Sequence, residues 1–112
     1  MFMRFYRPDG SPYPDGEEGL QEWARDFAND ELRILRQDRL PDGSRVSTVW
    51  LGLDHAPNLL DPLHTPLIFE TMAFDKHGHI LDTLRYPSPS DAITGHLQAL
   101  ARLHLRIAAE CS

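Results

Sequence analysis

Two residues whose side chains could take part in chemistry, Asp54 and His55, directly follow the apolar segment V-S-T-V-W-L-G-L. Catalytic and binding residues are frequently found where a strand enters a loop. Glu70 is a third candidate, because it lies between Phe69 and Thr71 in a second apolar segment, and burial raises the pKa of a carboxyl group toward that of a general acid. Asp54, His55 and Glu70 are therefore the candidate catalytic residues of a small-molecule-dependent or metal-dependent enzyme.

Glu70 also has a structural interpretation. Arg45 and Arg85 could reach it from neighbouring strands, and a satisfied ion pair is the more common environment of such a carboxylate. The chain has no serine or cysteine nucleophile motif and no glycine-rich phosphate loop. A catalytic role and a structural role for Glu70 both remain open at this point.

Histidines are the other candidate ligands. His77 and His79 flank Gly78 in a turn and form the alternative metal site, because imidazole nitrogens bind zinc. Further ligands could come from His55, His64, Asp54, Asp61 and Asp75. A His-x-His sequence at a turn is also typical of exposed polar segments, so no metal or other cofactor is expected. His96 and His104 are interpreted as hydrogen-bonded residues at the boundary of an apolar helix face.

Turn sequences divide the first two thirds of the chain. Pro-Asp-Gly-Ser occurs at 8–11 and again at 41–44, and this sequence is typical of tight turns. Residues 56–65 contain two prolines and no periodic pattern, which predicts a long and mobile connection. Strands are predicted at 1–7, 32–40, 46–55, 67–74 and 79–86.

Two helices complete the expected fold. Apolar residues repeat at helical spacing over 16–29, after Asp15 and Glu18, which are spaced as in a capping box. Ser88 predicts the start of the closing helix. Residues 1–112 are therefore expected to form a single α+β domain, an antiparallel four- to five-stranded meander with two helices packed on one face.

Alternation along the strands predicts which face of the sheet is free. Val49, Leu51 and Leu53 are expected to face the helices, together with Leu67, Phe69 and Ala73. The opposite face would display Val46 and the predicted partner-binding residues, which are Thr48, Trp50, Ile68, Glu70, Met72 and Phe74. An exposed apolar face of this kind indicates an interaction site. A different strand register, or coverage by the first strand and the loop at 56–65, would instead bury it within the monomer.

Composition narrows the classes of partner. Seventeen acidic residues against eleven lysines and arginines give a net charge of -6, which disfavours direct binding to nucleic acid. No apolar run is long enough to cross a bilayer and no signal-peptide pattern is present. The single cysteine, Cys111, has no intramolecular disulfide partner. A cytoplasmic protein is therefore expected, with no membrane association.

The two strand motifs, V-S-T-V-W-L-G-L-D-H and P-L-I-F-E-T-M, resemble those of a family of small uncharacterised proteins from tailed phages and prophages. Glu22-Trp23, Arg85-Tyr86 and Gly95-His96 add to this resemblance. Family members usually have a glycine-rich loop where this chain has A-P-N-L-L-D-P-L-H-T. The resemblance implies a phage or prophage setting, in the cytoplasm of a host cell, and no activity, cofactor or catalytic residue.

These observations favour a non-enzymatic accessory protein that acts by protein–protein interaction. Its expected role is host takeover, by modulating a host process or inhibiting a host defence complex. A homodimer is an alternative use of the same surface, and the enzyme that uses Asp54, His55 and Glu70 is the alternative function.

Overall fold

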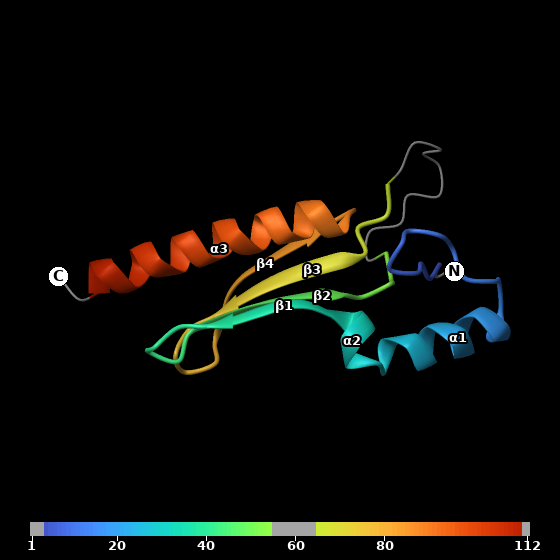
Figure 1. The fold of residues 1–112 in the computed structure, drawn as a ribbon, viewed down its shortest axis with the longest axis horizontal. Coiled ribbons are helices and arrows are strands. Elements are labelled where there is room, and N and C mark those ends of the chain that lie inside the picture. The colour runs from blue at the N-terminus through green and yellow to red at the C-terminus, as the bar shows by residue number, and fades with distance from the viewer. Residues whose placement is uncertain (1–3, 55–64, 111–112) are drawn as a thin grey trace.

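The computed structural model describes residues 4–54 and 65–110, and four strands form its one antiparallel sheet (Figure 1). The strands lie in chain order: β1 (Ile34–Arg39), β2 (Arg45–Trp50), β3 (Phe69–Phe74) and β4 (Ile80–Tyr86). Two helices precede the sheet, α1 (Glu17–Phe27) and α2 (Asp30–Arg33), and α3 (Pro89–Glu110) follows it. The predicted α+β fold with an antiparallel meander is confirmed.

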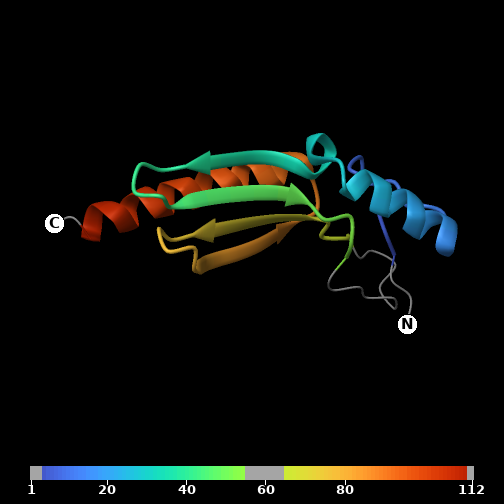
Figure 2. The same cartoon turned by 90° about the horizontal axis from the view of Figure 1, so that it is seen from below.

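The long helix α3 extends along one face of the sheet, whereas α1 lies beyond the end of the sheet at which β2 ends (Figures 1 and 2). Two aromatic residues of α1, Trp23 and Phe27, pack against the cluster that contains Trp50. The indole N–H of Trp23 donates to the carbonyl oxygen of Leu51 at 2.9 Å. The two helices therefore contribute to one core from different directions.

Local signals account for the helix starts. The hydroxyl of Ser88 accepts a hydrogen bond from the backbone N–H of Asp91 at 3.1 Å, which confirms Ser88 as the start signal of α3. The expected capping box at Asp15 is wrong, because Gly16 is the N-cap of α1 and makes no side-chain cap. The short helix α2 was not expected; the side chain of Asn29 caps it by accepting the N–H of Glu31 at 3.0 Å.

The predicted strands at 1–7 and 46–55 both differ from the structure. The described part of the first segment makes isolated bridges, from Phe5 to Leu53 and from Tyr6 to Pro12, and no regular strand. β2 ends at Trp50 because Gly52 adopts a left-handed conformation with φ of 72°. A side chain at this position would collide with the rings of Trp23 and Trp50. Residues 55–64, which include most of the predicted mobile loop at 56–65, lie outside the described residues.

The interface between α3 and the sheet is apolar at both ends and polar in the middle. The cluster at one end is centred on Tyr13, Trp50, Ile68, Phe69 and Ala92. The cluster at the other end is centred on Leu40, Val46, Ala73, Ala99 and Leu103. Between them the sheet presents Thr48 and Thr71, and α3 presents His96. All three of these polar residues are buried.

The predicted assignment of faces is wrong for β2. Its core-facing residues are Val46, Thr48 and Trp50, and all of them are fully buried. They pair across the sheet with Ala73, Thr71 and Phe69. Phe69 and Ala73 were correctly expected to face the core, so the error is a shift of one residue in the pairing of β2 with β3, and such a shift exchanges the two faces of a strand. Ile68 is also buried, in the cluster at the end of the sheet.

Candidate functional site

The face of the sheet opposite α3 is not covered by any element of the described residues, as the view in Figure 2 shows. Strand pairing places the following side chains on it: Ile34, Gln37, Arg39, Arg45, Ser47, Val49, Glu70, Met72, Phe74, Ile80, Thr83 and Arg85. We call this set the open face. Glu70, Met72 and Phe74, three of the predicted partner-binding residues, belong to it, whereas Thr48, Trp50 and Ile68 are buried within the monomer.

The centre of the open face is apolar. Val49, Met72 and Phe74 lie on the two central strands and are half-buried by their neighbours on the same face. Ile80, at the edge strand, is 59% exposed. A solvated face of an antiparallel sheet is normally polar, so this apolar centre distinguishes the open face from an ordinary water-facing surface.

Polar residues surround this centre. Glu70 forms an ion pair with Arg85 of the neighbouring strand, with 3.1 Å between Oε2 and Nη2, so the structural interpretation of Glu70 is confirmed in its Arg85 form. The side chain of Gln37 donates to the hydroxyl of Ser47 at 3.1 Å. Both contacts connect adjacent strands across the open face.

Two arginines at one end of the open face are directly opposite each other. Arg39 of β1 and Arg45 of β2 are a cross-strand pair. The guanidinium of Arg45 lies 4.2 Å from the centre of the Phe74 ring. Within the described part of the chain, neither arginine has an acidic partner within ion-pair distance.

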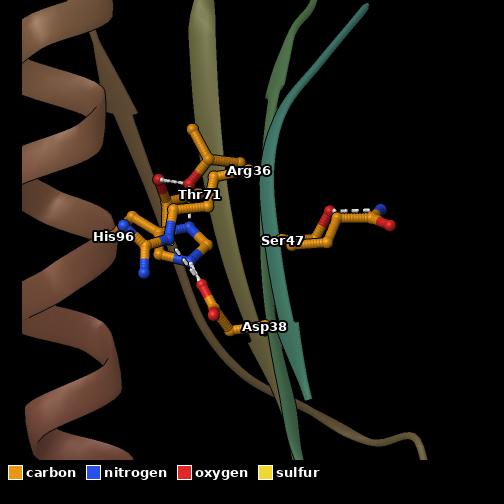
Figure 3. Close-up of polar contacts among 7 residues, drawn as sticks. Arg36, Asp38, Ser47, Thr71 and His96 are labelled. Carbon is orange, nitrogen blue, oxygen red and sulfur yellow. Dashed lines mark hydrogen bonds and ion pairs between the residues drawn. The ribbon is translucent and has the colours of Figure 1, made fainter. Parts of the chain in front are cut away.

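A chain of hydrogen bonds crosses the middle of the α3–sheet interface on the other face (Figure 3). The carboxylate of Asp38 lies 2.7 Å from His96 Nε2, and His96 Nδ1 lies 2.7 Å from the Thr48 hydroxyl. Thr48 and Thr71 are joined at 2.6 Å between their hydroxyl oxygens. Both ring nitrogens of His96 therefore have a hydrogen-bond partner, and the Thr48 hydroxyl contacts both His96 and Thr71.

The order acid, imidazole, hydroxyl is also that of a catalytic triad, but the environment here is that of a core. Thr48 and His96 have no exposed surface and Thr71 is 3% exposed. A nucleophile must reach its substrate, and these hydroxyl groups are enclosed between the sheet and α3. His96 was correctly expected to be hydrogen-bonded but was placed at a boundary, whereas Asp38 and Thr71, the two ends of the hydrogen-bond chain, had not been singled out.

Hydrogen bonds lower the pKa of Asp38, which lies at one end of this chain of hydrogen bonds. The pKa of Asp38 is held below its ordinary value, first by the hydrogen bond from Arg36 and then by that from His96. Arg36 Nε lies 2.7 Å from Asp38 Oδ2. The ionised form of Asp38 is therefore the form that the folded protein stabilises.

This pKa gives a testable pH dependence. Because the pKa is lower in the folded state, the stabilisation by Asp38 is present above the ordinary carboxyl pKa of about 4 and is lost as pH falls through the lowered value. The difference in the free energy of unfolding between the native protein and Asp38→Asn should therefore shrink in acid. Urea unfolding at a series of pH values measures this difference. Asp15→Asn, at an exposed residue before α1, is the control, and parallel curves for native protein and Asp38→Asn would contradict the prediction.

The remaining candidate residues do not form one site within the described part of the chain. Asp54 is buried, and its carboxylate lies 3.5 Å from the backbone N–H of Leu67, whereas Glu70 is paired with Arg85. His55, His64, Asp61 and Cys111 lie outside the described residues. No group of three or more His, Cys, Asp and Glu side chains able to hold a metal ion occurs among residues 4–54 and 65–110.

His77 and His79 belong to a turn that Asp75 organises. The Asp75 carboxylate accepts the backbone N–H groups of both histidines, at 2.8 and 2.9 Å. His79 Nδ1 lies 3.3 Å from the other oxygen of Asp75, and the centres of the two imidazole rings are 6.1 Å apart. Hydrogen bonds to the two backbone N–H groups, that of His79 first, hold the pKa of Asp75 below its ordinary value. A structural role in the turn accounts for this arrangement.

A surface cavity of about 240 Å³ lies beside α3, between Leu81, Ala99 and Leu103. Asp82 and Arg102 also line it and form an ion pair with each other at 3.0 Å. Its charged groups are therefore already paired, and the open face remains the strongest candidate site.

Comparison with known proteins gives no relative. No protein-family model matches the chain, and the searches of curated proteins and of solved structures found no match either. Among the described residues, no helix combines the length and the apolar character needed to cross a membrane.

Proposed function

We propose that the protein acts by binding another protein through the open face. The observation that supports this is the apolar centre of a sheet face over which no described element lies, with Val49, Met72 and Phe74 at its middle. Methionine and phenylalanine are enriched in protein–protein interfaces, and a polar rim around an apolar centre is typical of such surfaces. This proposal keeps the predicted mode of action and moves its centre from Trp50 to Met72.

The setting of this interaction is proposed from the motif resemblance. The strand motifs around Trp50 and Glu70 resemble those of phage and prophage proteins, so the partner is sought among proteins of a bacterial host. Modulation of a host process, or inhibition of a defence complex, requires no catalytic site and needs only an occupied surface.

Met72→Asp tests the proposal. A carboxylate at the centre of the interface would be desolvated without a partner, so we expect affinity for the partner to fall at least about tenfold, or about 1.4 kcal/mol. The fold should tolerate the change, because Met72 faces away from α3. The partner is first isolated from a bacterial lysate on the immobilised native protein, and the affinity of each purified variant is then measured by calorimetry.

Leu105→Asp is the matched control. Leu105 is 72% exposed on α3, and this change adds the same charge outside the open face. Unchanged affinity in Met72→Asp, or an equal loss in both variants, would contradict the proposal. Sedimentation of the protein alone identifies the remaining alternative, since a homodimer that Met72→Asp dissociates would make a second copy the partner.

A further inference from the structure

The two opposed arginines of the open face require an explanation that the fold does not supply. Like charges directly opposite each other on neighbouring strands are destabilising, and Arg39 and Arg45 occupy such a pair. The protein as a whole has an excess of acidic residues, with a net charge of -6. The rest of the chain therefore contains many carboxylates, yet no described carboxylate is placed within ion-pair distance of these two cations.

The position of the pair connects it to the apolar centre. Arg45 is opposite both Arg39 and Phe74 in the sheet and stacks on the Phe74 ring at 4.2 Å. Stacking holds the guanidinium plane over the ring and leaves its N–H donors available at the edge of that plane. Arg39 and Arg45 are both exposed. Two sets of unpaired donors thus border the same apolar surface.

Guanidinium groups in this arrangement suit a carboxylate, because a planar guanidinium binds a carboxylate through two parallel hydrogen bonds. A nucleic acid would bring phosphates to the same donors, but a polyanion is repelled by the overall charge of this protein. It would also leave Val49 and Met72 without apolar contacts. An acidic protein segment would place carboxylates on the two arginines and apolar side chains on Val49 and Met72. It would also carry fewer negative charges than a nucleic acid.

We infer that the open face binds an acidic segment of another protein, with aspartate or glutamate side chains held by Arg39 and Arg45 and neighbouring apolar side chains packed on Met72. This inference rests on the proposed function, and it adds the chemistry of the partner. Binding relieves the repulsion between the two arginines, so the unfavourable pair in the free protein becomes a favourable contact in the complex.

Selection from a random peptide library on the immobilised native protein tests this inference without knowledge of the partner. We expect the selected peptides to be enriched in aspartate and glutamate next to apolar residues. Arg45→Gln should weaken their binding at least tenfold, measured by fluorescence anisotropy of labelled peptides. Arg25→Gln, which removes the same charge from an exposed position on α1, should leave their binding unchanged.

The outcomes separate the two proposals. Peptides that depend on Met72 but show no acidic enrichment and no dependence on Arg45 would overturn the inference and leave the proposed function standing. Peptides that do not depend on Met72, or the absence of any selected peptide, would overturn both. Tighter binding of labelled single-stranded DNA than of the acidic peptides would also overturn the inference, since phosphates would then be the preferred anions.

Arg39→Glu provides a second readout that a structural role would not give. A glutamate opposite Arg45 converts a repulsive pair into an attractive one, so the melting temperature should rise by about 1–5 °C while binding of the acidic peptides is lost. A structural role for Arg39 predicts the opposite, which is a lower melting temperature. That result would overturn the inference.

Discussion

Replacement of Trp50 by alanine is expected to lower the free energy of unfolding by about 3–5 kcal/mol. Trp50 has no exposed surface, and the rings of Phe27 and Tyr13 lie 6.3 and 6.5 Å from its own. Its indole N–H donates to the carbonyl oxygen of Tyr6 at 3.0 Å. Alanine would leave a large cavity and would remove the donor of this carbonyl. Urea unfolding followed by circular dichroism measures the loss.

Two further variants divide this effect into its parts. Trp50→Phe keeps most of the apolar volume and removes the N–H group, so its cost should be smaller, about 1–3 kcal/mol. Leu51→Ala is the neighbouring control, because Leu51 is only half-buried and its truncation removes less contact. A loss in Leu51→Ala as large as that in Trp50→Ala would contradict the assignment of Trp50 to the core.

His96→Ala is expected to cost about 2–5 kcal/mol of folding stability. The change removes a fully buried ring and deprives both Thr48 and Asp38 of a hydrogen-bond partner. Thr48 would then keep only Thr71 as a hydrogen-bond partner, and the loss of a hydrogen bond by a buried polar group is costly because no water replaces it. The same denaturant titration measures this effect, and a cost below about 1 kcal/mol would show that the hydrogen-bond chain contributes little.

Apolar replacement of the whole hydrogen-bond chain is the matched comparison. The triple variant Thr48→Val, Thr71→Val, His96→Leu leaves no unpaired hydroxyl in the interface, so it should be more stable than His96→Ala alone. If the triple variant is instead the less stable protein, the loss in His96→Ala comes from lost packing volume and not from unsatisfied polar groups.

The parts of the fold that were predictable are those governed by local chemistry. The turn at 41–44 follows from its own residues, since Asp42 accepts the N–H and the hydroxyl of Ser44, both at 2.8 Å. Ser88 likewise acts on a residue only three positions away. Such contacts involve neighbours in the chain, so the sequence pattern contains all the information that they need.

The free face of the sheet was not predictable in the same way. In β2 both alternating sets contain apolar residues, and the set that is buried includes Thr48, a polar residue. Thr48 belongs to the core because its hydroxyl meets His96, which is 48 positions away in the chain. Periodicity does not identify a partner at that separation, and the apparent polarity of Thr48 therefore favoured the wrong face.

The candidate site followed in part from its residue types. Glu70, Met72 and Phe74 were correctly expected on the free face, and Arg85 was one of two expected partners of Glu70. The opposed pair of Arg39 and Arg45 was not foreseen, because it depends on the register of β1 against β2. The Pro-Asp-Gly-Ser turn at 41–44, which joins β1 to β2, was the signal that could have suggested this pairing.

The polar middle of the α3–sheet interface also determines the axial position of the helix relative to the sheet. Residues four positions before and after His96 are Ala92 and Leu100, which lie about one helical turn, or about 5.4 Å, along the axis. Displacement of α3 by one turn would bring the apolar side chain of Ala92 or Leu100, in place of an imidazole ring, over Thr48. Gly95 opposes the same displacement, because a Cβ at its position would collide with the ring of Tyr86, and each buried hydroxyl without a partner costs about 1–3 kcal/mol. His96 and Gly95 together therefore fix the axial position of α3 on the sheet.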